Sequence, residues 1–286
     1  MNFQKFKLIF NQNLHINFLS FFVYLLPVCL IIGPAPADIF ISILAIYAIF
    51  ITIYFKRWDL HFTKLSLIII LFNFTILISS LISISPDLSL HSSIFYLRFY
   101  LFSIAIYYLA NENKYFLKFF FIFFSITLFI IIFDSFFQLY FKVNTTGNIM
   151  INNRLVSFFG SELILGSFLA RLTPIFFSLL FIFYSERKYF YQINLFFLLV
   201  FFIIILMTGE RVSIFINIFF NFFYLIFLYA NKFKKVLTPI LILIFTFVIL
   251  IYSNDSLKSR ILNFSYNQVF LSSNKDYIFT NSPIMQ

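Results

Sequence analysis

The sequence consists largely of apolar stretches, separated from one another by short polar segments. An apolar helix of about 20 residues crosses the hydrocarbon core of a bilayer and satisfies its own backbone groups there. No stretch alternates strictly between apolar and polar residues, which disfavours a membrane barrel. We therefore predict an all-α, polytopic helical membrane protein with one transmembrane domain over residues 1–286. The nine predicted spans lie near 14–32, 39–55, 65–84, 92–110, 115–141, 162–184, 189–207, 212–230 and 236–252.

The composition excludes several other classes of protein. Hydrophobic residues make up 62% of the chain and charged residues only 10%, whereas a soluble domain has about 45–50% apolar and about 25% charged residues. Cys29 is the single cysteine, which excludes disulfides and thiolate metal sites. The three histidines, His15, His61 and His91, lack the spacing of a zinc site. We expect no metal and no cofactor.

The basic residues predict the orientation of the chain in the membrane. With a cytoplasmic N-terminus, twelve of the 20 lysines and arginines fall in inside segments and six in outside segments. The other two, Arg98 and Arg171, fall within spans. This is the positive-inside pattern. Because it accounts for the net charge of +10, we expect the partner to be the lipid bilayer and not a nucleic acid.

The two ends of the chain carry further signals. Lys5, Lys7 and the Ala35-Pro36-Ala37 segment resemble a signal peptide, but the flanking prolines favour an uncleaved first span. The polar residues 253–286 are expected to begin a periplasmic loop. Because the sequence stops within this segment, we expect a C-terminally truncated chain.

Two short segments at the predicted outer face keep glycine and charged residues against the general bias towards Phe, Ile and Leu. In the first, Arg154 precedes a glycine-containing turn, and Ser161 and Glu162 stand where the N-cap and first turn of the sixth span belong. Such a helix N-terminus can bind an anion, or it can be an ordinary interfacial cap. The second segment, Thr208-Gly209-Glu210-Arg211, is a tight turn between two spans, and its alternative reading is a polar hairpin.

Three charged residues lie well inside predicted spans, away from the span ends: Arg98, Asp134 and Arg171. Each costs about 2.5–3.5 kcal/mol at the centre of a membrane helix, and such residues mark functional interiors by default. Gln138 follows Asp134 on the same helix face. The alternative is a structural ion pair of Asp134 with Arg98 or Arg171.

Arginines gathered near the outer side would suit a diphosphate, which a guanidinium binds through two parallel hydrogen bonds. Nearby carboxylates could orient or deprotonate a hydroxyl nucleophile. The predicted substrate-binding residues are Arg98, Asp134, Gln138, Arg154 and Arg211, and the predicted catalytic residues are Glu162 and Glu210.

At these residues the sequence resembles the O-antigen ligase and O-antigen polymerase family of bacterial membrane glycosyltransferases. The similarity runs from Asp134 and Gln138 through Arg154 and Gly160-Ser161-Glu162 to the Thr208-Gly209-Glu210-Arg211 turn. Members of this family often have an arginine, an aromatic–glycine turn, a helix start with small residues and a later Thr-Gly-x-Arg turn.

The resemblance implies a multi-pass protein of the bacterial inner membrane that transfers a glycan from an undecaprenyl-diphosphate-linked donor to lipid A-core or another glycan. Arg154 and Arg211 would bind the diphosphate. The family also places a functional histidine in a large periplasmic loop, whereas this sequence has no histidine after His91. Three alternatives stay open: an O-antigen repeat polymerase, a secondary transporter or flippase of lipid-linked glycans, and a structural membrane subunit that catalyses no reaction.

Overall fold

The computed structural model describes residues 3–229 and 234–263, and within these ranges it is helical, with no β-strand. Nine of its helices are long and apolar enough to cross a membrane, which confirms the predicted fold class. The chain is therefore an all-α, polytopic membrane protein. The spanning helices are α1 (Phe3–Ile32), α2 (Pro34–Tyr54), α3 (Lys64–Leu81), α4 (Pro86–Glu112), α5 (Phe116–Phe141), α6 (Leu165–Tyr184), α7 (Phe190–Thr208), α8 (Arg211–Leu228) and α9 (Lys234–Ser253).

The helix ends differ from the predicted spans for local reasons. α2 and α4 begin earlier than predicted because Pro34 and Pro86 occupy their first turns, where proline is well tolerated. α3 ends at Leu81, three residues earlier than predicted. α6 begins at Leu165, three residues later than predicted.

The segment after α9 is partly helical. A short helix, α10 (Asp255–Lys258), begins at Asn254, whose side-chain oxygen accepts hydrogen bonds from the backbone N–H groups of Ser256 and Leu257. A π-helical turn, η3 (Ser259–Asn263), follows. The rest of the predicted periplasmic loop, 264–286, lies outside the described residues.

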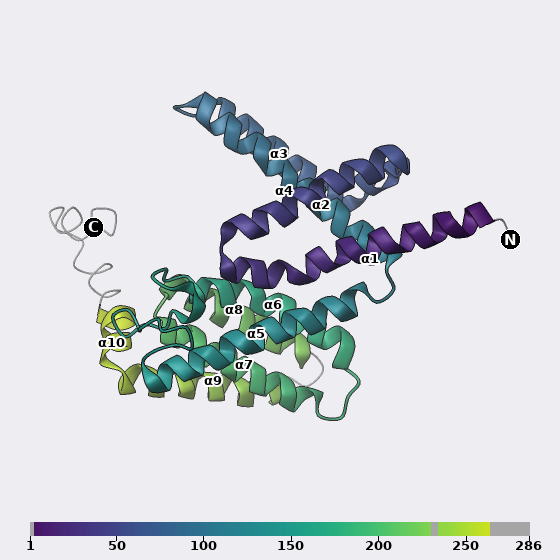
Figure 1. Cartoon of the computed structure of the whole chain (residues 1–286). Helices are drawn as coiled ribbons and strands as arrows, with labels where there is room; N and C mark the ends of the chain where they lie inside the picture. Colours follow the sequence, from purple (N-terminus) through teal and green to yellow (C-terminus); the bar gives the residue numbers. More distant parts are fainter. Residues whose placement is uncertain (1–2, 230–233, 264–286) are drawn as a thin grey trace. The chain divides into compact units, whose positions relative to one another are not determined.

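The helices form two compact units, Met1–Thr127 and Leu128–Gln286, and α5 contributes to both. In the first unit α4 packs along α2 and α3, and α3 and α4 run side by side as a hairpin (Figure 1). Its core is built around fully buried aliphatic side chains of α2 and α4, among them Leu44, Ile51, Ile104 and Leu109.

In the second unit α6 packs against α7 and α8, and α9 packs against α7 and α8 (Figure 1). Aromatic side chains fill the space between α6, α7 and α8. Phe177 of α6 contacts Phe201 of α7 and Tyr224 of α8. Such ring pairs, arranged edge-to-face or tilted, contribute about 0.5–1.5 kcal/mol each beyond the area that they bury.

A hydrogen-bonded histidine joins α2 to α4 in the first unit. His61, in the 3₁₀ turn η1 (Trp58–Phe62), contacts Thr52 Oγ1 through Nε2 at 2.8 Å and the Tyr100 hydroxyl through Nδ1 at 2.6 Å. The Thr52 hydroxyl donates its hydrogen to the carbonyl of Ala48, so it must accept from His61 Nε2. Nε2 therefore donates, and in the neutral ring Nδ1 accepts the hydroxyl hydrogen of Tyr100. Burial lowers the pKa of His61, and the carboxylate of Asp59 partly opposes this effect.

This network predicts a pH-dependent stability. Because the pKa of His61 is lower in the folded than in the unfolded chain, the unfolded state binds more protons, and stability falls as the pH drops below about 6.5. We expect His61→Gln to reduce this loss, measured as the change in thermal unfolding midpoint between pH 7.5 and pH 5.5 in detergent. The exposed His91 provides the control, and an equal effect of His91→Gln would contradict the assignment.

Candidate functional site

The loop that joins α5 to α6, residues 142–164, is held in place by polar side chains at the end of α5. Gln138 is completely buried. Its Oε1 accepts the backbone N–H groups of Val156 and Ser157 at 3.0 and 2.9 Å, and its Nε2 donates to the carbonyl of Asn148 at 3.1 Å. An isolated buried amide would be costly, whereas here the amide replaces the backbone partners that the loop lacks.

Asp134 lies one turn earlier and is 1% exposed. Its carboxylate accepts hydrogen bonds from the backbone N–H and the hydroxyl of Thr145 and from the hydroxyl of Ser157. These donors stabilise the buried carboxylate in place of an arginine. Ser157 has a positive φ of 48°, a conformation that costs about 1–3 kcal/mol. Ser157 is held there by the hydrogen bonds that it donates to Asp134 and Gln138 and by one that its carbonyl accepts from Asn144 Nδ2.

The same loop positions Arg154 over the turn between α7 and α8. The guanidinium Nε of Arg154 donates to the carbonyl of Thr208 at 2.6 Å, and the backbone N–H of Leu155 donates to Met207 at 3.5 Å. Gly209 ends α7 in the left-handed region, with φ 67°, which favours glycine. The Thr208 bond uses only one of the five N–H donors of Arg154.

Glu210 ties this turn to the start of α6. Its Oε1 accepts the backbone N–H of Gly166 and its Oε2 that of Ser167, both at 2.8 Å, and Oε2 also accepts the hydroxyl of Ser213 at 2.8 Å. A carboxylate at a helix N-terminus is favoured by the free N–H groups and by the helix dipole. The approach is close, because a Cβ at Gly166 would overlap Thr208 Oγ1 and lie 2.9 Å from Glu210 Cδ.

This arrangement corrects the predicted cap of the sixth span. Ser161 and Glu162 lie in the turn before α6, and the N-cap residue is Ile164, which has no side-chain cap. Glu210, distant in sequence, takes their place. The N–H groups of Gly166 and Ser167 therefore bind a carboxylate of the chain itself instead of a separate anion.

Three arginines meet at a cleft beside this turn. The cleft has a volume of about 550 Å³. It is lined by Arg154, Gly209, Glu210, Arg211, Val212 and Arg260. Arg154 and Arg260 both lie close to Gly209, since a Cβ at this position would be 3.8 Å from Arg154 Nε and 3.6 Å from Arg260 Cδ. Burial and the positive charge of Arg260 lower the pKa of Arg154, and Glu210 partly opposes them.

The structure thus brings together Arg154, Arg211 and Glu210 of the predicted site. Asp134 and Gln138 lie in the same unit, but their side chains are buried beneath the loop that carries Arg154. Glu162 is exposed in the turn before α6.

Two ionisable residues within spans lie apart from the cleft lining. Arg98 belongs to the first unit, where its Nη2 contacts Asp38 Oδ1 of α2 at 2.9 Å. Arg171 is exposed on α6.

Sequence analysis missed Arg260. It lies in the polar segment after α9, where it counted only as one of the basic residues of an outside segment. Arg260 lines the cleft because η3 follows α10, and Leu257 of α10 packs beside Gly209. No sequence pattern links it to the 208–211 turn.

The fold defines the class of this chain as a polytopic helical membrane protein with a cationic cleft at one end of its second unit. Comparisons of the chain with protein-family models, with curated proteins and with solved structures found no match.

The bonds of Glu210 predict a structural role that can be measured. In Glu210→Gln the amide nitrogen replaces one of the two accepting oxygens, so that one N–H of the α6 N-terminus loses its partner. We expect a loss of about 1–3 kcal/mol in the free energy of unfolding, measured by denaturation in detergent. Glu162→Gln, at an exposed position, should stay within about 0.5 kcal/mol of the wild type. Equal stability of the two variants would contradict the capping role.

Proposed function

We propose that this chain is an O-antigen ligase-like membrane glycosyltransferase, which moves a polyprenyl-diphosphate-linked glycan to an acceptor hydroxyl at the periplasmic face. The observation that carries the proposal is the meeting of Arg154, Arg211 and Arg260 at one cleft. The sequence motifs that resemble the family contribute two of these three arginines, and the fold contributes the third.

The charges of the cleft favour an anionic ligand. Among the described residues, the cleft is lined by three arginines and one glutamate, and both oxygens of that carboxylate already accept backbone N–H groups. Arg154 and Arg260 repel each other, so an anion bound between them would stabilise both charges. A diphosphate offers several oxygens to planar guanidinium groups, which bind them in pairs of parallel hydrogen bonds.

The size and the place of the cleft suit a lipid-linked donor. Its volume of about 550 Å³ falls within the range of about 300–1,000 Å³ that is typical of ligand sites. The cleft lies where α7 ends and α8 begins, at an end of the spanning helices. A donor can therefore keep its hydrocarbon tail beside the helices, in the bilayer, while its diphosphate reaches the arginines.

The orientation of the cleft follows from the loop charges. With the N-terminus in the cytoplasm, nine spans place the loop after α5 and the turn after α7 on the outer side, where the positive-inside rule predicts few basic residues. The arginines of the cleft are exceptions to that rule. In a bacterial inner membrane this side is the periplasm, where lipid A-core or another glycan can supply the acceptor hydroxyl.

The proposed chemistry uses the arginines to stabilise charge. An acceptor hydroxyl attacks the anomeric carbon, and the bond to the diphosphate breaks. Arg154, Arg211 and Arg260 stabilise the negative charge that grows on the departing diphosphate. The attacking hydroxyl gives its proton to a base, for which the sequence predicts Glu162 or Glu210. In the structure Glu210 accepts the backbone N–H groups of α6, and Glu162 does not line the cleft.

Arg260 provides the sharpest binding test, because sequence analysis did not select it. We expect Arg260→Ala to raise the Kd for undecaprenyl diphosphate by about 10–100-fold, as the loss of a charged hydrogen-bonding pair predicts. Arg260→Lys should recover part of the affinity. Binding is measured with the purified chain in nanodiscs, and Arg187→Ala, at an exposed turn after α6, is the control. If Arg260→Ala and Arg187→Ala had the same Kd, Arg260 would not contribute to binding.

Activity is tested separately in cells. Arg154→Ala and Arg211→Ala should each abolish long-chain lipopolysaccharide in a bacterium that depends on this gene, because each removes a guanidinium from the diphosphate. Gel ladders of lipopolysaccharide give the readout, and immunoblots confirm stable expression. A normal ladder from a stably expressed variant would count against the assigned roles.

A further inference from the structure

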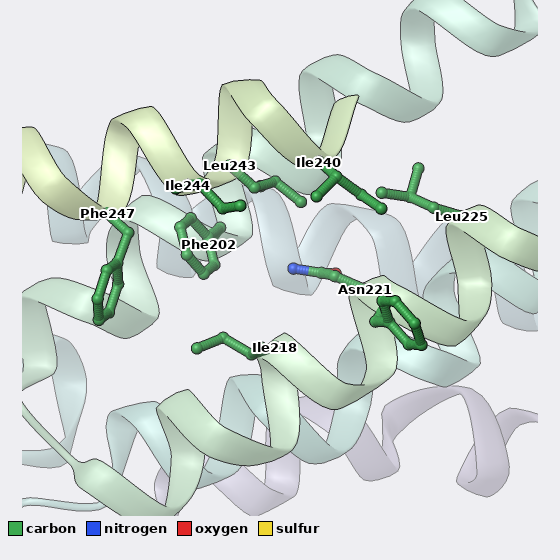
Figure 2. Close-up of a pocket in the computed structure, with 9 residues that line it drawn as sticks. Phe202, Ile218, Asn221, Leu225, Ile240, Leu243, Ile244 and Phe247 are labelled. Atoms are coloured by element: carbon green, nitrogen blue, oxygen red, sulfur yellow. The ribbon is translucent and has the colours of Figure 1, made fainter. Parts of the chain in front are cut away.

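A second cavity lies in the second unit, between α7, α8 and α9 (Figure 2). Its volume is about 250 Å³. Asn221 is the one polar residue in its lining, and the other side chains are aliphatic or phenylalanine, among them Phe202, Leu225, Leu243 and Phe247. The arginine cleft begins at Arg211, whereas Asn221 lies ten residues further along α8. At about 1.5 Å per residue, the two sites are about 15 Å apart along the helix.

The side chain of Asn221 extends from α8 into this cavity, with its amide nitrogen at the tip (Figure 2). The residue is 2% exposed. Its Nδ2 donates to Asn217 Oδ1 at 3.0 Å, but its own Oδ1 and Asn217 Nδ2 have no hydrogen-bond partner among the described residues. The single bond between the two amides therefore leaves one oxygen and one nitrogen without a partner. Unpaired polar atoms are costly in an apolar interior.

The cavity opens to the side of the helices. Ile218, Phe222 and Ile244 stand at its edge and are 43%, 47% and 53% exposed. Since these residues lie within membrane-spanning helices, their exposed faces meet lipid and not water. A ligand therefore enters from the bilayer and must be soluble in it.

The depth of the cavity restricts the chemistry of this ligand. Asn221 lies about 15 Å from the start of α8, which is near the middle of a hydrocarbon core of about 30 Å. Phosphate headgroups stay at the membrane surface, so a phospholipid presents only its hydrocarbon chain at this depth. A pure hydrocarbon fills the volume but leaves the amide unpaired.

We propose that this cavity binds a membrane-soluble alcohol, with its hydrocarbon body against α7 and α9 and its hydroxyl on the amide of Asn221. A hydroxyl both donates and accepts. The two amides can also turn over together, so that Asn221 presents N–H groups in place of its oxygen. A hydroxyl pairs with either arrangement, whereas a ketone or an ester carbonyl pairs with only one. This site is independent of the arginine cleft and of the glycosyl-transfer proposal.

The test uses two photoreactive ten-carbon probes, a diazirine-bearing decanol and the matching hydrocarbon without the hydroxyl. Both are added to the full chain in nanodiscs, and labelled peptides of α8 and α9 are quantified. We expect saturable labelling by the alcohol, with an apparent affinity about fivefold higher than that of the hydrocarbon, as one net hydrogen bond predicts. Decanol should compete for this labelling at about one fifth of the concentration that decane requires.

Variants separate the hydrogen bond from the shape of the cavity. Asn221→Leu should abolish the preference for the alcohol. Because this change leaves Asn217 unpaired, the double variant Asn217→Leu/Asn221→Leu keeps the test valid if the single variant is unstable. Ile244→Trp, which fills the mouth, should reduce labelling by both probes. Phe219→Trp is the control, since Phe219 is 58% exposed on α8 and does not line the cavity.

Two outcomes would overturn the proposal. Equal labelling by the two probes in the wild-type chain would mean that the cavity accepts any bilayer chain and that water satisfies the amide. A preference for the alcohol that persists in Asn221→Leu and in the double variant would place the hydroxyl elsewhere.

Discussion

The carboxylate of Glu210 joins three helices at the end of the second unit that carries the arginine cleft. It belongs to the turn between α7 and α8, and it accepts the first free N–H groups of α6. The bond requires the turn to approach α6 so closely that only glycine fits at position 166. Arg211 follows Glu210 directly, so the bond that caps α6 also determines where this arginine begins α8. Glu210, which the sequence predicts as a catalytic residue, thus has a structural role beside the cleft, because it binds backbone N–H groups of α6.

The second support comes from α5. Asp134 and Gln138 satisfy backbone and hydroxyl groups of the 142–164 loop, and the loop in turn places Arg154 on the carbonyl of Thr208. Buried polar networks are favourable only when each member has a partner, and here both oxygens of Asp134 and both polar atoms of the Gln138 amide take part in hydrogen bonds. Arg154 is therefore held from two directions, by the loop behind it and by the end of α7. A guanidinium fixed in this way loses little freedom when it binds an anion.

The local parts of the structure could be predicted from sequence, and the contacts between distant parts could not. The predicted span at 14–32 coincides with the apolar part of α1, and the predicted span at 115–141 differs from α5 by one residue. The predicted cap of α6 was wrong. Ser161 and Glu162 match a local capping pattern, but the carboxylate that accepts the N–H groups of α6 belongs to Glu210. Arg260 was missed for the same reason, since its place beside Gly209 depends on how α10 packs and not on neighbouring residues. The unpaired amide of Asn221 also emerges only when α7 and α9 close the space around α8.

The sequence by itself determined the fold class, the number of spans in the described part of the chain and the segments that hold the charged residues. It could do so because a bilayer imposes one local rule, that each crossing segment be apolar and helical. Tertiary structure alone decided which charges meet. The cleft is lined by Arg154, Arg211 and Arg260, which are far apart along the chain. They come together because Gln138 holds the 142–164 loop, Glu210 holds the turn between α7 and α8, and α10 packs beside that turn. Hydropathy carries no information about these pairings, because each depends on the geometry of hydrogen bonds and on packing between helices.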